Sequence, residues 1–72
     1  MTNINCLIID DEPLAVNVIK NFIEEINNIS VKETFNNAID ALAFLKNNSV
    51  DLIFLDINMP LLNGLHFIKN LE

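Results

Sequence analysis

Short apolar runs alternate with longer amphipathic stretches along this chain. Residues 4–9 are apolar except for Asn5, and residues 52–55, inside the stretch 51–56, contain no polar side chain. Runs of this length without alternation are typical of strands covered on both faces, as in parallel sheets under helices. The pattern therefore predicts two buried strands, one at residues 4–9 and one at residues 51–56.

The segment between these two runs has a different pattern. In Val31–Phe35 apolar and polar residues alternate, which places Val31, Glu33 and Phe35 on one face of an extended strand and the two residues between them on the other. Charged residues in such a strand are typical of a sheet edge. We therefore predict an edge strand here.

Two helices are predicted between the strands. Pro13 suits the first turn of a helix, and the acidic residues before it favour the positive end of the helix dipole. The apolar residues of this helix recur at three- and four-residue steps and end near Asn27-Asn28; they are Ala15, Val18, Ile19, Phe22, Ile23 and Ile26. Asn36-Asn37 can cap a second helix. Its apolar positions are Ala38, Ala41, Leu42 and Leu45.

A third helix is predicted to begin at Asn63-Gly64 and to run to residue 71. The order β-α-β-α-β-α implies parallel strands joined by right-handed crossovers. The fold class is therefore α/β, with a parallel sheet flanked by helices. The two buried strands should be neighbours, and the alternating strand should lie outside them.

Composition narrows the function classes. With 72 residues the chain is at most one domain, and 51% hydrophobic residues with 19% charged residues is the composition of a folded core. The formal net charge is −6, and the four lysines are scattered along the chain. This gives no electrostatic footprint for nucleic acid.

The single cysteine and the lengths of the apolar runs indicate the compartment. Cys6 lies within an apolar stretch, which favours a buried, reduced thiol over a disulfide or a metal cluster. No apolar run approaches the roughly 20 residues that a helix needs to span a bilayer. We expect a soluble, cytoplasmic protein that does not contact the membrane.

Acidic residues follow both buried strands. Asp10 and Asp11 end the first strand, and Asp56 ends the third. Adjacent strands lie about 4.8 Å apart, so these carboxylates can converge on one point, where their mutual repulsion favours a bound cation, and hard oxygen ligands suit Mg²⁺. Two simpler interpretations stay open. Asp10 and Asp11 would only cap the helix that follows them, and Asp56 would only end a strand.

Two separated motifs agree in sequence, spacing and predicted strand context. Ile8–Pro13 has the sequence Ile-Ile-Asp-Asp-Glu-Pro, and Leu55–Pro60 has the sequence Leu-Asp-Ile-Asn-Met-Pro, with Asn63-Gly64 beyond it. Together they resemble the receiver domain of bacterial two-component response regulators. The amino-acid sequence of the second motif resembles that of the LytTR-type regulators in particular.

The resemblance implies roles for individual residues. Asp56 would be the phosphoacceptor, Asp10 and Asp11 would hold Mg²⁺ with it, and the main-chain carbonyl of Asn58 would supply a further metal ligand. The partner would be a sensor histidine kinase that transfers its phosphoryl group to Asp56. The chain would then be a phosphoacceptor rather than an enzyme.

The resemblance also sets the expected extent of the domain. A receiver domain has a flavodoxin-like, CheY-like fold of five β-α units in the strand order 2-1-3-4-5, and residues 1–72 supply the first three. We expect an N-terminal part of a receiver domain, without units 4 and 5. Those units carry the hydroxyl residue and the lysine that contact the phosphoryl group in this family, so phosphotransfer would be impaired.

Two other classes remain as alternatives. A haloacid-dehalogenase-like phosphatase also has an aspartate nucleophile after an apolar strand, but its second acid lies two residues further on, where this chain has Asn58. A non-catalytic α/β fragment that survives by oligomerisation would keep the acidic group without using it.

An assembly is also predicted. In the strand order 2-1-3 the third strand is an edge, and residues 52–55 lack the charges, proline or bulge that protect edges in soluble proteins. We expect a homodimer in which the third strands of two copies pair about a two-fold axis, giving the order 2-1-3-3′-1′-2′.

Overall fold

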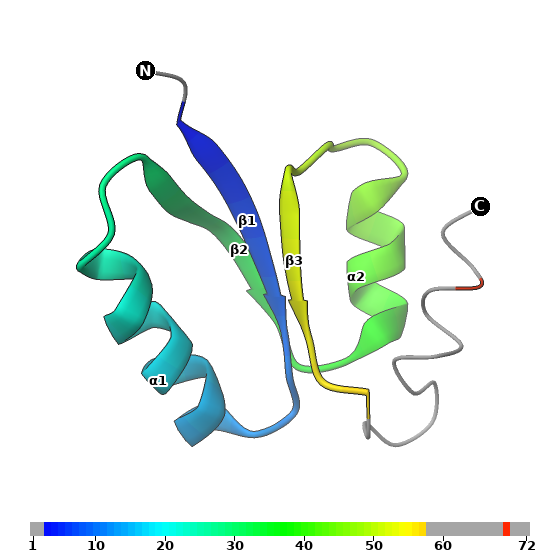
Figure 1. Ribbon diagram of the computed structural model, residues 1–72. Coiled ribbons are helices and arrows are strands. Elements are labelled where there is room, and N and C mark those ends of the chain that lie inside the picture. The colour runs from blue at the N-terminus through cyan, green and yellow to red at the C-terminus, as the bar shows by residue number, and fades with distance from the viewer. Residues whose placement is uncertain (1–2, 58–68, 70–72) are drawn as a thin grey trace.

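The computed structural model describes residues 3–57 and residue 69, and contains a three-stranded parallel sheet. Its strands are β1 (Ile4–Ile9), β2 (Ile29–Phe35) and β3 (Leu52–Leu55), in the order β2-β1-β3 (Figure 1). Both the fold class and the strand order predicted from the apolar patterns are confirmed.

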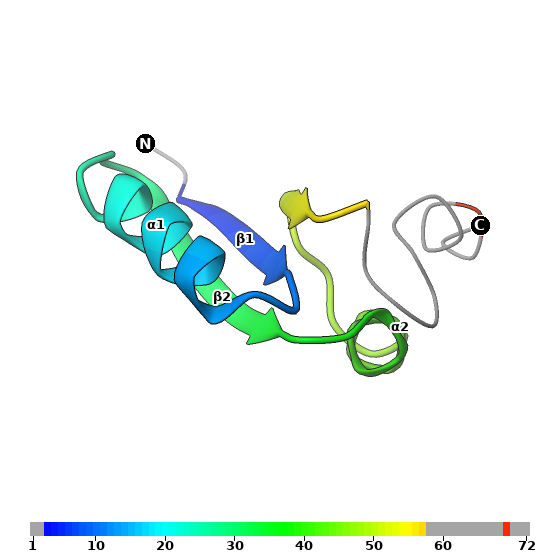
Figure 2. The same cartoon turned by 90° about the horizontal axis from the view of Figure 1, so that it is seen from below.

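Two helices connect the strands and cover opposite faces of the sheet (Figure 2). They are α1 (Pro13–Glu24) and α2 (Ala38–Leu45). The predicted third helix, residues 63–71, lies outside the described residues apart from Lys69. No helix in the described part of the chain is long and apolar enough to cross a membrane.

The two helices begin in different ways. At α2, the Asn37 side-chain oxygen accepts a hydrogen bond of 2.8 Å from the Asp40 amide, which satisfies one N–H group of the first turn. At α1, Glu12 occupies the capping position without a side-chain bond, and Pro13 follows it. Because proline has no N–H, the first turn of α1 has one fewer group to satisfy.

The core consists of two apolar clusters, separated by β1. Cys6 and Ile8 pack with Ile23 of α1 on one face. Leu7 and Ile9 pack on the other face with the buried residues of α2, which are Ala38 and Ala41. Since side chains alternate across a strand, β1 supplies both clusters and is completely buried from Cys6 to Ile9.

The strand β2 departs from the predicted alternation. Its register with β1 shifts by one residue: Cys6 pairs with Val31, but Leu7 pairs with Glu33. Lys32 is the extra residue of a β-bulge, so Val31 packs on the α1 face and Phe35 packs on the α2 face. The prediction that Val31, Glu33 and Phe35 share one face is therefore wrong, because a bulge breaks the period of two.

The helix α1 is amphipathic as predicted, but its apolar side is wider than its contact with the sheet. Ile23 is buried, and Val16 and Ile19 pack beside it. Four other large apolar residues of α1 and its C-terminal extension are spaced four apart and are mostly exposed; they are Leu14 (72%), Val18 (53%), Phe22 (68%) and Ile26 (54%). We call these four residues the α1 apolar row.

Candidate functional site

The carboxyl ends of the three strands are tied together by main-chain hydrogen bonds. The Asp10 amide donates to the Phe35 carbonyl at the end of β2, over 3.0 Å. The Asp56 amide donates to the Ile9 carbonyl at the end of β1, also over 3.0 Å. These bonds continue the sheet beyond its last paired residues. The three arrows end at the same edge of the sheet (Figure 1), and the acidic residues follow there.

Three carboxylates meet at this edge. One oxygen from each of Asp10, Asp11 and Asp56 lies within 4.8 Å of the other two. Asp10 and Asp56 are half-buried, and Asp11 is exposed. We call these three residues the acidic cluster. The structure thus brings together the described side chains that the sequence predicted to converge, whereas Asn58 lies outside the described residues.

Asp10 is held in a local turn. One of its carboxylate oxygens, Oδ1, accepts a hydrogen bond of 2.9 Å from the amide of Glu12. This is the side-chain-to-backbone bond of an Asx-type turn. The bond ends at Glu12, one residue before α1, so Asp10 shapes the turn that leads into the helix.

The donor set fits a hard divalent cation. All three side chains offer carboxylate oxygens, which Mg²⁺ prefers. These oxygens lie within 4.8 Å of one another and would draw closer together around a bound ion. Within the described residues no cysteine or histidine joins the cluster, so softer metals find no matching ligand here.

A shallow hollow of about 240 Å³ adjoins the acidic cluster. It lies between the start of α1 and the end of β2, and its lining includes Asp10, Asp11, Pro13, Thr34 and Phe35. The cluster is therefore open to solvent on the β2 side. A small solute can reach the side chains of Asp10 and Asp11 from there.

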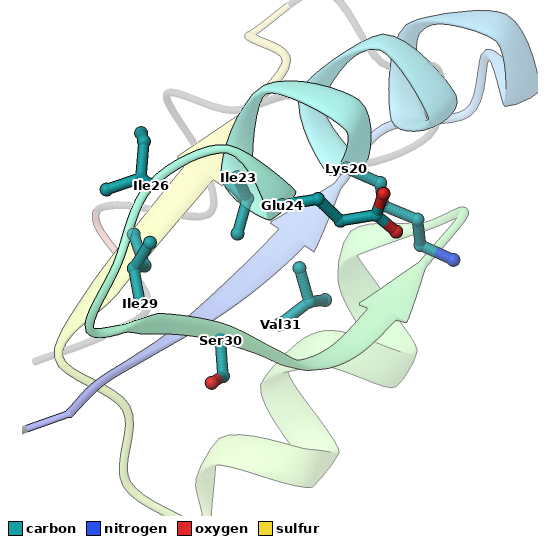
Figure 3. A pocket seen from close by; sticks show the side chains of 7 residues that line it. All are labelled: Lys20, Ile23, Glu24, Ile26, Ile29, Ser30 and Val31. Carbon is teal, nitrogen blue, oxygen red and sulfur yellow. The ribbon is translucent and has the colours of Figure 1, made fainter.

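A second hollow, of about 330 Å³, lies towards the other end of the sheet (Figure 3). It lies between the second half of α1 and the start of β2, and polar and apolar side chains line it about equally; the lining residues are Lys20, Ile23, Glu24, Ile26, Ile29, Ser30 and Val31. Its two charged residues have opposite signs, and it contains no residue of the acidic cluster. It offers no ligand set for a metal.

The family comparison matches almost the whole chain. The model of the response regulator receiver domain covers residues 6–72. This confirms the family predicted from the two motifs, including the resemblance to LytTR-type regulators. The match does not support the haloacid-dehalogenase alternative.

Curated relatives resemble the chain over most of its length. The transcriptional regulatory protein YpdB of Escherichia coli K12 is 40% identical over 66 residues, which are 92% of this chain and 27% of that protein. BtsR of the same strain is 35% identical over 69 residues, which are 96% of this chain and 29% of that protein. The chain thus spans little more than a quarter of the length of either relative.

Solved structures share the same arrangement of strands and helices. The RcsB response regulator of Salmonella typhimurium superposes with a TM-score of 0.88 at 26% identity, over 99% of this chain and 37% of that one. The response regulatory domain of MrkE from Klebsiella pneumoniae superposes with a TM-score of 0.85 at 36% identity, over 92% of this chain and 54% of that one.

Proposed function

Because the chain belongs to the response regulator receiver domain family, we propose that it is a cytoplasmic phosphoacceptor module of two-component signalling. A sensor histidine kinase transfers a phosphoryl group from its phosphohistidine to Asp56. Mg²⁺ is held by Asp10, Asp11 and Asp56, together with the main-chain carbonyl of Asn58. The observation that carries the proposal is the convergence of three carboxylate oxygens within 4.8 Å at adjacent strand ends.

In the proposed reaction, a carboxylate oxygen of Asp56 attacks the phosphorus atom. A P–O bond forms, the P–N bond to the imidazole breaks, and its electron pair stays on the ring nitrogen. The Ile9 carbonyl fixes the Asp56 backbone, and the turn from Asp10 to Glu12 fixes the neighbouring carboxylate. Mg²⁺ would offset the crowding of negative charge around the transferred group.

Phosphorylation by a small donor tests the proposal. We expect acetyl phosphate with Mg²⁺ to add one phosphoryl group, seen by intact mass spectrometry, and Asp56→Ala to abolish the addition. Asp10→Asn keeps the size of the side chain but removes a negative charge from the metal site, so it should slow the reaction and weaken its dependence on Mg²⁺. Modification that survives Asp56→Ala would refute the assignment of Asp56.

Metal binding can be tested separately from phosphotransfer. A Mg²⁺ titration followed by amide NMR shifts should move the amides of the acidic cluster first, because the ion binds there. The matched control is Asp51→Asn, since Asp51 lies at the opposite end of β3 and binds the Asn5 amide. Equal responses of Asp10→Asn, Asp51→Asn and the wild type would contradict the metal site.

We also propose a homodimer of this 72-residue chain through β3. The two outer strands differ: β2 carries Lys32, Glu33 and a bulge, which protect an edge, whereas β3 carries only apolar residues. Leu52 on β3 is 41% exposed. A second β3 can pair with the first in antiparallel orientation about a two-fold axis.

The dimer is tested by light scattering at micromolar concentration. Wild-type protein should have twice the mass of one chain. Leu52→Lys places a charge on the unprotected edge and should give a monomer. Glu33→Lys on β2 is the control, and it should leave the mass unchanged. A monomeric wild type with intact circular dichroism would rule out this dimer.

A further inference from the structure

Phe35 is the residue where the core on the α2 face meets the acidic cluster. It is the last residue of β2. Its carbonyl accepts the 3.0 Å hydrogen bond from the Asp10 amide, and its side chain packs against the core formed by Leu7, Ile9 and α2. Phe35 also lines the hollow beside Asp10 and Asp11. One residue therefore contacts both the helix packing and the candidate site.

The ring of Phe35 is oriented by a second aromatic ring. Phe44, in the last turn of α2, lies with its ring centroid 5.4 Å from that of Phe35, and the two planes are inclined at 56°. Tilted pairs at this distance are favourable because the edge of one ring meets the face of the other. The pair fixes the end of β2 against α2.

The geometry points to Phe35 as a positioning residue for the acidic cluster, held in place by Phe44. The path runs from the Phe44 ring to the Phe35 ring, and from the Phe35 carbonyl to the Asp10 amide. The carboxylate of Asp10 is then oriented by the Glu12 amide. The expected effect of Phe35 on Mg²⁺ binding rests on the metal site proposed above.

Asp56 is linked to this path only indirectly, through Ile9 and Leu55, which pack in the same core as Phe35. The Asp56 amide donates to the Ile9 carbonyl, and Ile9 belongs to the central strand, which has neighbours on both sides. Loosening the end of β2 should therefore affect Asp10 more than Asp56. This asymmetry distinguishes a positioning role from a general loss of packing, which would affect both amides alike.

The first test compares these two amides by hydrogen exchange in protein without Mg²⁺. Phe44→Leu keeps an apolar side chain but removes the ring pair, so we expect the Asp10 amide to exchange about tenfold faster while the Asp56 amide changes little. Ile23→Val is the control, because Ile23 is buried on the other face. Equal acceleration of both amides in Phe44→Leu would overturn the inference.

The second test measures Mg²⁺ affinity by amide shifts. We expect Phe35→Leu and Phe44→Leu each to weaken binding about threefold, and the double variant to weaken it hardly further, because both remove one path. Ile23→Val should bind as the wild type does. Additive losses would contradict a shared path.

The two proposals fail separately. A wild-type chain that ignores Mg²⁺, but whose Asp10 amide responds to Phe44→Leu, refutes the metal site and supports the positioning of Asp10. A chain that binds Mg²⁺ with the same affinity in all the variants supports the metal site and refutes the positioning role.

Discussion

The helices α1 and α2 cover opposite faces of the same sheet, but they pack against it differently (Figure 2). At the buried positions of α2 stand two alanines, Ala38 (3% exposed) and Ala41 (0%). At the contact of α1 stands the larger Ile23, and beyond it the α1 apolar row remains mostly exposed. The helix with the larger buried side chain is therefore the one that leaves more large apolar residues exposed, although α2 also exposes Ile39 (57%).

This difference shows what amphipathic patterning determines. In α2 the small buried residues are flanked by larger ones that also pack against the core, among them Leu42, Phe44 and Leu45. In α1 the apolar residues cover a wider arc than one sheet face can contact. Periodicity indicates the side of a helix that avoids water, but not how much of that side the sheet covers.

The two faces can be compared most directly through adjacent residues of β1. Ile8 packs on the α1 face and Ile9 on the α2 face, and both are fully buried. Ile→Ala at either position should cost about 2 to 5 kcal/mol. We expect the larger loss at Ile9, because its surroundings on the α2 face are packed more completely. Urea unfolding measures both, and Ile→Val variants replace them if the alanine variants do not fold.

Substitutions at the N-terminal capping positions of the two helices should have the next largest effect on the free energy of unfolding. Asn37→Ala removes the cap bond to the Asp40 amide and should lower the free energy of unfolding by about 1 kcal/mol. Glu12→Ala removes no cap bond, so it should leave stability nearly unchanged. Thermal unfolding followed by circular dichroism compares the pair, and equal losses would show that the difference in capping has no energetic consequence.

The α1 face contains the only cysteine of the chain, and it gives a smaller, pH-dependent effect. Burial raises the pKa of the Cys6 thiol, so the folded state keeps its proton where the unfolded state has lost it. The resulting stabilisation is complete below the ordinary thiol pKa of about 8.5 and is lost as pH rises through the folded-state value. Urea unfolding between pH 7 and pH 10, about the range of thiol titration, should show this decline, and Cys6→Ala should flatten it.

The smallest effect is expected on the α1 apolar row. Phe22 is 68% exposed, so Phe22→Ala should change the free energy of unfolding by no more than about 0.5 kcal/mol. Urea unfolding measures this change. A loss comparable to that at Ile8 would mean that the α1 apolar row is covered in solution.

Much of the fold follows from the sequence, because strand burial and strand order are linked. The unbroken apolar run at residues 52–55 predicted a neighbour of β1, and the alternating segment predicted an outer strand; both are confirmed. The bulge at Lys32 could not be predicted, since one extra residue changes no propensity. It becomes necessary only when Val31 and Phe35 must enter cores on opposite faces.

The candidate site was partly predictable for a similar reason. Parallel strands end at one edge, so Asp10, Asp11 and Asp56 had to lie near one another, and their oxygens do. The part played by Phe35 gave no signal in the sequence, because it acts through its carbonyl. Every residue has a main-chain carbonyl, so the residue type does not show which carbonyl binds the Asp10 amide. Only the pairing of β2 with β1 shows that it is the carbonyl of Phe35.

The central place of β1 has a consequence for synthesis on the ribosome. Asn5, at the start of β1, bonds to Asp51, which lies 46 positions later, just before β3. At about 5 to 20 residues per second, the ribosome makes the most deeply buried strand of the sheet several seconds before its second neighbour. During that interval one edge of β1 is open to other nascent chains.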